Sequence, residues 1–359
     1  MFNSRSFILL VCGVASVVAT NPALGQTKAD NASRPISEDL RDIINEQSEL
    51  GKELQSQHGL LRETQSDNRQ DVRQPTTQLT SGEYSITQSW SQEENFRRPY
   101  HVSVPQNAAD KKLPVFIFMH GNGGNAKEAM RGFTRGRRKL ASEFIMVFAQ
   151  GYRESWNIVS ERSKADDKRF IEAIVLKLAS YENVDANNFT IMGASNGAAM
   201  VNQLMIESRL PNIRNYISGV SPLNVFQYDG ENFKAKGKDN NYSEVATPMT
   251  GKRLLNISGT EDKLVPYGGG PSKVIPAKDG KLAFVGAERS TFLWAKQMGF
   301  AGDQFSRPTR TEGIVESFSY LGGDVVHYKV NKVGHGATHG ISEAMLLTFL
   351  QGGEKTDHQ

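Results

Sequence analysis

Short, continuous apolar runs separated by amphipathic stretches dominate the chain from residue 83 onward. Runs of this kind are typical of strands buried on both faces of a parallel sheet. They lie at 115–119, 144–148, 189–192, 216–220 and 254–258, with further strands expected at 316–320 and 325–330. Helical periodicity of apolar residues fills the intervals, most clearly at 166–180, 196–207, 288–298 and 341–350. Strands that alternate with helices predict an α/β fold with a mostly parallel central sheet flanked by helices.

The run at 189–192 leads into Gly193-Ala194-Ser195-Asn196-Gly197 and then into a predicted helix. In such a sheet, ligands bind at the carboxyl ends of the strands. The pattern G-x-S-x-G between strand and helix is a nucleophile elbow, whose small residues permit a sharp turn that exposes the serine. We therefore predict Ser195 as a nucleophile, with the backbone N–H of Asn196 placed to stabilise an oxyanion. A glycine-rich turn with a capping serine is the alternative.

A second glycine-rich segment, His120-Gly121-Asn122-Gly123-Gly124, follows the run at 115–119. Loops of this kind bring a second backbone N–H near the serine of esterase-type sites. Asn122 is the candidate donor and Gly123 the alternative, while His120 is expected to orient the loop. The segment lacks the Lys-Ser/Thr of a phosphate-binding loop, which argues against a nucleotide site.

A serine nucleophile needs a base and an orienting acid. Asp262, preferred over Glu261, follows the run at 254–258, and His335 comes first after the last strand. We prefer His335 over His339, which lies four residues later. The two histidines also have the spacing of a metal-binding pair, but Gly336 replaces the glutamate of H-E-x-x-H and no third ligand is evident. No metal or cofactor is predicted.

The two ends of the chain differ in character from its centre. Residues 1–25 combine Arg5, an apolar run and a small-residue cleavage pattern, which indicates a signal peptide and a secreted or periplasmic protein. The polar segment 26–82 is read as a linker with one marginal helix, 83–352 as the catalytic domain and 353–359 as a polar tail. Once the leader is removed, no membrane span remains, and the single cysteine, Cys12, is removed with it.

Charge excludes one class of partner. Lys+Arg 42 against Asp+Glu 39 leaves a net charge of +3, which is too small for a dedicated nucleic-acid binder. The polar stretch 222–250 is read as a surface insertion, and the sequence leaves open whether it forms part of a lid. The oligomeric state stays open.

From these residues the chain resembles the secreted α/β-hydrolase esterases grouped with polyhydroxybutyrate depolymerases and feruloyl or acetylxylan esterases. The resemblance covers about residues 84–350. Its motifs are His120-Gly121-Asn122-Gly123-Gly124, Gln150-Gly151-Tyr152, Ser155-Trp156-Asn157, Ala165-Asp166-Asp167, Gly193-Ala194-Ser195-Asn196-Gly197, Gly259-Thr260-Glu261-Asp262, Val265-Pro266-Tyr267 and Gly334-His335. It implies Ser195 as nucleophile, Asp262 as acid and His335 as base.

The resemblance also bears on the substrate. It implies an ester substrate, either acyl esters of a polysaccharide or a hydroxyalkanoate polyester, and Trp156 and Tyr267 are candidate substrate-binding residues. A buried core position is the alternative for Trp156. The chain departs from the family at Ala198 and at Ala337-Thr338-His339-Gly340, so its substrate pocket is expected to differ from the family's while the triad is retained. A serine peptidase of the same fold and a non-catalytic carbohydrate-binding or envelope protein are the competing functions.

Overall fold

The computed structural model describes residues 78–106, 111–278 and 280–352. The predicted leader, nearly all of the predicted linker and the polar tail lie outside the described residues. Leu79 falls within the range predicted as linker, yet its side chain is buried and its backbone exchanges hydrogen bonds with the side chain of Asn183. The packed part of the chain therefore includes residues ahead of position 83.

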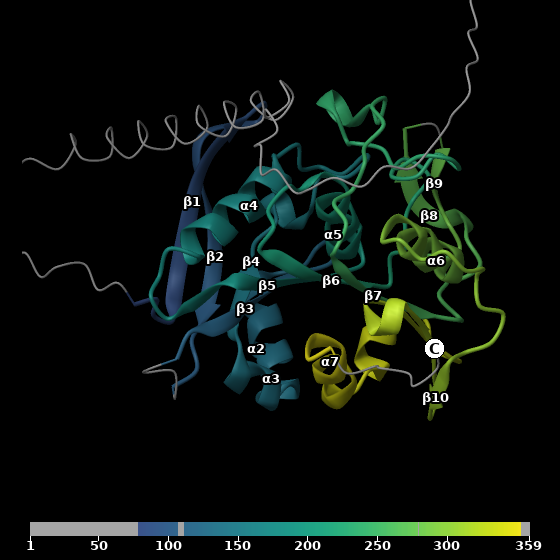
Figure 1. Ribbon diagram of the computed structural model, residues 1–359. Coiled ribbons are helices and arrows are strands. Elements are labelled where there is room, and N and C mark those ends of the chain that lie inside the picture. Colours follow the sequence, from purple (N-terminus) through teal and green to yellow (C-terminus); the bar gives the residue numbers. More distant parts are fainter. Residues whose placement is uncertain (1–77, 107–110, 279, 353–359) are drawn as a thin grey trace, which may run out of the picture. The chain divides into compact units, whose positions relative to one another are not determined.

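A ten-stranded sheet runs through the centre of this part of the chain (Figure 1). In chain order its strands are β1 (Gly82–Trp90), β2 (Glu93–Ser103), β3 (Leu113–Met119), β4 (Ile145–Ala149), β5 (Val184–Ala194), β6 (Ile213–Gly219), β7 (Arg253–Gly259), β10 (Arg310–Glu312), β11 (Val315–Tyr320) and β12 (Val325–Val330). They are arranged as β1-β2-β4-β3-β5-β6-β7-β12-β11-β10. The strands from β4 to β12 in this order run parallel, and antiparallel strands complete both edges.

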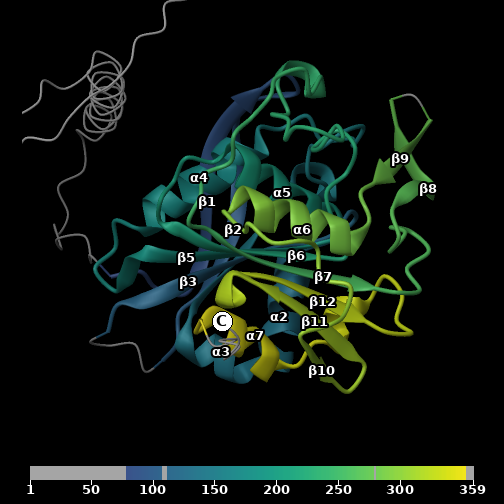
Figure 2. The same cartoon turned by 45° about the vertical axis from the view of Figure 1, so that its right-hand side comes forward.

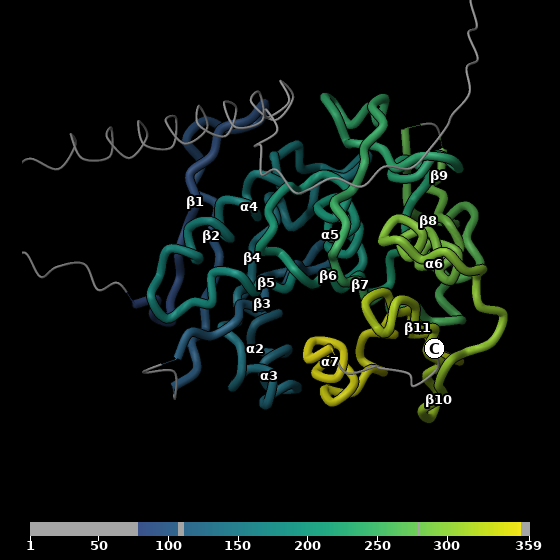
Figure 3. The backbone as a smooth tube through the Cα atoms, in the orientation of Figure 1, coloured from purple at the N-terminus to yellow at the C-terminus, as the bar shows by residue number. Residues whose placement is uncertain are grey.

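Helices cover both faces of the sheet, as the ribbon and the backbone tube show (Figures 1 and 3). They are α2 (Ala126–Gly136), α3 (Arg138–Glu143), α4 (Asp167–Leu178), α5 (Asn196–Glu207), α6 (Ala287–Gln297) and α7 (Glu343–Leu350). Helices α4, α5 and α6 lie over one face, and α2, α3 and α7 over the other. The buried side chains divide in the same way into two apolar clusters, one on each side of the sheet.

Local sequence explains where helix α4 begins and how it packs. Asp166 caps its first turn by accepting a hydrogen bond from the backbone N–H of Arg169, 3.1 Å away. Its buried face carries Phe170, Ile171, Ile174, Val175 and Leu178. Side chains at this spacing share one face of a helix, so the whole stripe packs against the sheet.

The predicted α/β fold with a mostly parallel sheet is confirmed. Helix α5 and strands β11 and β12 include the predicted residues 196–207, 316–320 and 325–330. A second, two-stranded sheet was not predicted. It pairs β8 (Gly270–Ala277) with β9 (Gly280–Phe284) and extends beyond the main sheet (Figure 2). Short single turns of 3₁₀-helix occur at Tyr152–Glu154, Lys238–Asn240, Leu321–Gly323 and Ala337–Gly340.

Candidate active site

The residues singled out from the sequence follow the carboxyl ends of four parallel strands. His120 follows β3, Ser195 follows β5, Asp262 lies just past β7, and His335 lies past β12. The carboxyl ends of parallel strands meet at one edge of a sheet. The fold therefore gathers at that edge side chains that are far apart in the sequence.

The turn between β5 and α5 is a tight elbow. Ser195 adopts φ 54°, ψ −117°, a backbone conformation that costs free energy for a residue with a side chain. The glycines on either side are needed for close packing. A β-carbon on Gly193 would lie 2.2 Å from the carbonyl oxygen of Gly197, and one on Gly197 would lie 2.4 Å from that of Met119. The G-x-S-x-G spacing thus follows from two backbone contacts that leave no room for a side chain.

Ser195, His335 and Asp262 form one chain of hydrogen bonds. His335 Nε2 lies 2.8 Å from Ser195 Oγ, and His335 Nδ1 lies 2.7 Å from Asp262 Oδ2. The carboxylate is itself held in place, because its Oδ1 accepts hydrogen bonds from the backbone N–H groups of Leu264 and Val265. The side chain of Asp262 is 3% exposed and that of His335 is 25% exposed.

Neither alternative residue takes part in this chain of hydrogen bonds. Glu261 is exposed to solvent. The Nδ1 of His339 bonds the carbonyl oxygen of Gly336 within its own loop, 3.1 Å away. The geometry therefore brings together the preferred residue of each pair.

The loop after β3 lies beside Ser195. A β-carbon on Gly121 would lie 3.5 Å from the Ser195 side chain, and Asn122 lines the same cavity as Ser195 and Asn196. The N–H of Gly123 is already used, because it donates to the carbonyl oxygen of Glu154 at 2.7 Å. Among the described residues no hydrogen-bond acceptor is found for the backbone N–H of Asn122 or Asn196. Gly123, the alternative donor, is therefore not available, whereas Asn122 and Asn196 are.

His120 holds the loop that carries Asn122. Its Nδ1 lies 2.7 Å from the carbonyl oxygen of Gly121, and its Nε2 accepts a hydrogen bond from the N–H of Gly151 at 3.0 Å. Burial lowers the pKa of this imidazole, which favours the neutral form that can donate through one nitrogen and accept through the other.

Trp156 is fully buried and does not offer a surface to a substrate. Its indole N–H donates to the carbonyl oxygen of His120 at 2.8 Å, and its backbone N–H donates to the side-chain oxygen of Asn196 at 2.7 Å. The prediction of Trp156 as a substrate-binding residue is wrong, and the core alternative holds. The indole ties two loops of the site together.

Tyr267 is likewise not a residue of the cavity. Its hydroxyl donates to Glu288 at 2.8 Å and lies 2.9 Å from Nε2 of the buried His327. Burial, together with the Glu288 carboxylate, raises the pKa of the phenol well above its usual value. The sequence alone does not show whether an aromatic residue after a strand end faces the site or the core.

A cavity of about 370 Å³ adjoins Ser195. Its apolar wall is drawn from the β8–β9 hairpin, from helix α5 and from neighbouring loops, namely Ile158, Ala199, Val265, Val274, Ile275, Pro276, Leu282 and Phe284. One carboxylate, Glu161, lies in this wall, with Arg162 and Ser160 next to it. Sequence reasoning missed Glu161 and the hairpin. The hairpin carries two prolines and shows no clean apolar alternation, and Glu161 belongs to no motif.

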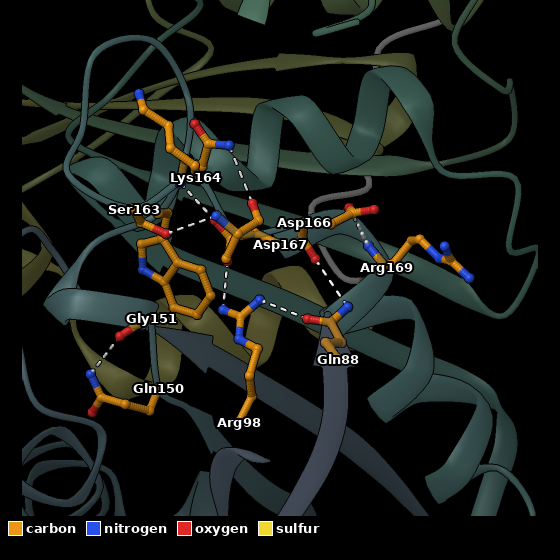
Figure 4. A network of polar contacts seen from close by, with 12 residues as sticks. Gln88, Arg98, Gln150, Gly151, Ser163, Lys164, Asp166, Asp167 and Arg169 are labelled. Atoms are coloured by element: carbon orange, nitrogen blue, oxygen red, sulfur yellow. Dashed lines mark hydrogen bonds and ion pairs between the residues drawn. The ribbon is translucent and has the colours of Figure 1, made fainter. Parts of the chain in front are cut away.

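The loop that carries Glu161 is anchored by a buried ion pair (Figure 4). Arg98, on β2, donates to Oδ1 of Asp167 in the first turn of α4, and the two side chains are 1% and 0% exposed. The other oxygen of Asp167 accepts from the backbone N–H of Asn157 at 2.6 Å. The guanidinium also donates to Gln88, whose amide donates to the carbonyl oxygen of Asp166. A side-chain network thereby fixes the start of the loop to the sheet edge.

The insertion at 222–250 does not line the cavity. It packs behind the loop instead. The hydroxyl of Tyr242 donates to the carbonyl oxygen of Ile158 at 2.6 Å, and the amide of Asn240 donates to that of Val159 at 3.0 Å. The segment therefore does not form a lid over this cavity, whose lining residues come largely from β8, β9 and the loop at 158–162.

Within residues 78–352 as described, no group of three or more His, Cys, Asp or Glu side chains is placed to hold a metal ion. Across the same residues, no helix has both the length and the apolar character that a bilayer span requires.

Comparisons with known proteins agree with the fold and with the predicted resemblance. No protein-family model matches the chain. Feruloyl esterase B of Piromyces equi is 27% identical over 198 residues, which are 54% of this chain and 34% of that protein. The chain thus spans about a third of the length of this curated relative.

Among solved structures, an acetyl xylan esterase from Aspergillus awamori superposes with a TM-score of 0.50 at 15% identity. The match covers 76% of this chain and 99% of that one. The fold is that of the α/β-hydrolases, as predicted. Both similar proteins are esterases by name, in agreement with the predicted class of hydrolase acting on carboxylic esters.

Proposed function

We propose that this protein is a serine esterase that hydrolyses carboxylic esters through an acyl-enzyme. Ser195 is the nucleophile, His335 the general base and Asp262 the acid that orients it. The observation that carries the proposal is the continuous hydrogen-bonded chain from Ser195 Oγ through both nitrogens of His335 to Asp262 Oδ2, at 2.8 and 2.7 Å. Nucleophile, base and orienting acid at such distances are the arrangement that acyl transfer through serine requires.

In the first half of the reaction Ser195 Oγ bonds to the ester carbonyl carbon, and its proton passes to His335 Nε2. The imidazolium that forms is stabilised by the Asp262 carboxylate at Nδ1. When the tetrahedral intermediate collapses, the bond from carbon to the alcohol oxygen breaks, and His335 returns the proton to that oxygen. The alcohol leaves, and the acyl group stays on Ser195.

In the second half a water molecule attacks the acyl carbon while His335 accepts its proton. Collapse of this intermediate releases the carboxylic acid and returns the proton to Ser195 Oγ. In both halves the negative charge develops on the former carbonyl oxygen. The backbone N–H groups of Asn196 and Asn122 are the donors we assign to it, since neither has an acceptor among the described residues and both residues line the cavity with Ser195.

The sequence and the similar proteins support a substrate class and a location. Acyl esters of a polysaccharide are favoured over a hydroxyalkanoate polyester, because the two similar proteins are named for feruloyl and acetyl xylan esters. We propose that the chain is exported, with residues 1–25 as the removed leader. Sequencing the amino terminus of the protein recovered outside the cytoplasm tests this, and a mature chain that retains residues 1–25 would contradict it.

Ser195→Ala tests the central assignment. We expect the variant to lose p-nitrophenyl acetate hydrolysis by on the order of 10³-fold or more and to resist covalent labelling by a fluorophosphonate. Ser180→Ala is the matched control, because Ser180 is exposed and bonds only the carbonyl oxygen of Lys177. Full activity in Ser195→Ala would refute the assignment. Faster cleavage of peptide amides than of esters would favour the peptidase, and absence of both activities and of labelling would favour a non-catalytic protein.

A further inference from the structure

Glu161 is a carboxylate in the wall of the cavity that adjoins Ser195, and the proposed reaction does not use it. Its Oε2 accepts hydrogen bonds from the backbone N–H groups of Ile158 and Val159, at 2.9 and 2.6 Å. Its Oε1 has a single partner among the described residues, the side-chain amide of Asn196 at 3.2 Å. An ionised carboxylate oxygen has two lone pairs. Oε1 therefore keeps the capacity to accept one more hydrogen bond.

The surroundings of Glu161 make an unused acceptor position on Oε1 energetically unfavourable. The apolar residues named above form much of the rest of the wall. Arg162 also lines the cavity, but within the described chain no Lys, Arg or His nitrogen lies within ion-pair distance of this carboxylate. Burial raises the pKa of Glu161 from its ordinary value. A buried carboxylate without a cation is stabilised by hydrogen-bond donors. A ligand that brings one hydrogen-bond donor into the cavity would occupy the remaining acceptor position on Oε1.

The lining residues indicate which part of an ester enters this cavity. Ser195, Asn122 and Asn196 line it, whereas His335 does not. The departing alcohol oxygen must lie at His335 Nε2 to receive its proton. The alcohol part therefore extends on the histidine side, and the acyl part occupies the cavity.

We propose that Glu161 is a specificity-determining residue that accepts a hydrogen bond from a hydroxyl group on the acyl part of the substrate. The apolar wall, drawn largely from the β8–β9 hairpin, contacts the carbon skeleton, and Oε1 binds the hydroxyl. The substrate class is then an ester of a hydroxylated carboxylic acid, and the hydroxyl can be carried by an aromatic ring or by an aliphatic chain. The inference rests on the proposed esterase function and deepens it.

A competing role for Glu161 is to position Asn196 alone. Both roles use Oε1, but they differ in what they predict for different substrates. A positioning residue acts on the backbone that surrounds Ser195, so its loss slows all esters by the same factor. A residue that binds the acyl hydroxyl affects only esters that carry one. The ratio of kcat/KM between two esters that differ in that hydroxyl separates the two roles.

The experiment uses pairs of methyl esters matched in the acyl group, 4-hydroxycinnamate against cinnamate and 3-hydroxybutyrate against butyrate. A hydrogen bond to a charged acceptor corresponds to a factor of roughly 10 to 100. In the wild-type protein we expect the hydroxylated member of one pair to have a kcat/KM higher by about that factor. Glu161→Gln should reduce the ratio to about 3 or less, mainly through KM. Glu94→Gln, on the exposed face of β2, is the matched control and should keep the wild-type ratio.

The possible outcomes distinguish failure of this inference from failure of the proposed esterase function. Equal kcat/KM within both pairs in the wild-type protein overturns the role of Glu161 while leaving an active esterase. A uniform loss on all four esters in Glu161→Gln, with the wild-type ratio retained, does the same and assigns the residue to positioning Asn196. If Glu161→Gln does not fold, the ratio of kcat/KM within each pair of esters, measured on the wild-type protein, still tests the inference. Absence of any ester hydrolysis together with absence of fluorophosphonate labelling overturns the esterase itself.

Discussion

Nδ1 of His335 lies 2.7 Å from Oδ2 of Asp262, whose other oxygen is held by the backbone N–H groups of Leu264 and Val265. The carboxylate therefore cannot turn away from the imidazole without giving up two hydrogen bonds. It fixes the tautomer in which Nε2 is free to take a proton from Ser195.

Replacing Asp262 with Asn should lower kcat by roughly 10³- to 10⁴-fold, because an amide nitrogen facing Nδ1 favours the opposite tautomer. Steady-state hydrolysis of p-nitrophenyl acetate measures the loss, and circular dichroism checks that the fold is kept. Glu261→Gln is the control, since Glu261 is exposed and should leave kcat unchanged. A loss of less than tenfold in Asp262→Asn would show that another group orients His335.

The elbow glycines give a second prediction. Gly197→Ala places a β-carbon 2.4 Å from the carbonyl oxygen of Met119, a backbone atom that cannot rotate away. We expect a loss of roughly 2 to 4 kcal/mol in the free energy of unfolding together with reduced kcat, as the loop after β3 is displaced.

Gly132→Ala is the control for that substitution. Gly132 lies inside helix α2 with open space around it. Alanine there should stabilise the protein by roughly 0.5 to 1 kcal/mol, measured by urea unfolding. Equal effects of the two substitutions would contradict the steric account of the elbow.

The Arg98–Asp167 pair gives a third prediction. Both side chains are almost fully buried, so Asp167→Asn leaves an uncompensated cation inside the protein and should cost about 3 to 5 kcal/mol of unfolding free energy. The double variant Arg98→Met with Asp167→Asn should lose less than the sum of the single losses, which a double-mutant cycle measures. Arg310 and Glu312 form an exposed pair for comparison, and breaking it should change the free energy by less than roughly 1 kcal/mol. Strict additivity at Arg98 and Asp167 would show that the two charges do not interact.

A fourth prediction concerns the stability of the folded protein at acidic pH. His327 is fully buried on β12 between the hydroxyl of Tyr267 and the side chain of Asn256, and Lys329 lies nearby. Burial lowers its pKa from 6.5 to about 3. Between these values the unfolded chain binds a proton that the folded chain does not, so the stability falls as the pH decreases from 6.5 toward 3.

The size of the acid effect follows from the shift, at about 1.4 kcal/mol for each unit of pH. His327→Gln removes the titrating group, so its unfolding free energy should depend less steeply on pH across this window than that of the wild-type protein. Urea unfolding at several pH values measures both slopes. His120, whose pKa burial also lowers, contributes equally to both proteins and cancels in the difference. Identical slopes would contradict the assignment of the effect to His327.

Most of the sheet could be predicted from the sequence, because buried parallel strands are continuous apolar runs and the helices between them show a clear period. Ser195, Asp262 and His335 could be proposed for the same reason, since each follows a strand whose carboxyl end must reach the same edge. The candidate donor Asn122 was separable from Gly123 only in three dimensions. The backbone N–H of Gly123 is not available to an oxyanion, because it donates to the carbonyl oxygen of Glu154, which lies in a different loop.

The residues around the substrate cavity were the part that sequence reasoning did not reach. Trp156 and Tyr267 have the residue type of substrate-binding positions, but contacts that are distant in sequence place both away from the cavity. Glu161 and the β8–β9 hairpin carry no motif, and the hairpin pairs its strands without the alternation that marks a half-buried sheet. A sequence pattern indicates the type of a secondary-structure element. Whether one of its side chains faces a cavity depends on which other elements pack around it.

The hairpin that forms much of the apolar wall is a separate two-stranded sheet, while the hydrogen-bonded chain from Ser195 to Asp262 is held by the strands of the main one. On the proposed function, the reaction centre therefore rests on the main sheet, whereas much of the apolar wall for the acyl group rests on the hairpin. We expect that exchanging the side chains of β8 and β9 changes which acyl groups the cavity admits and leaves the reaction centre intact. The scaffold is in this sense modular, and variation within a lineage should concentrate at residues 270–284.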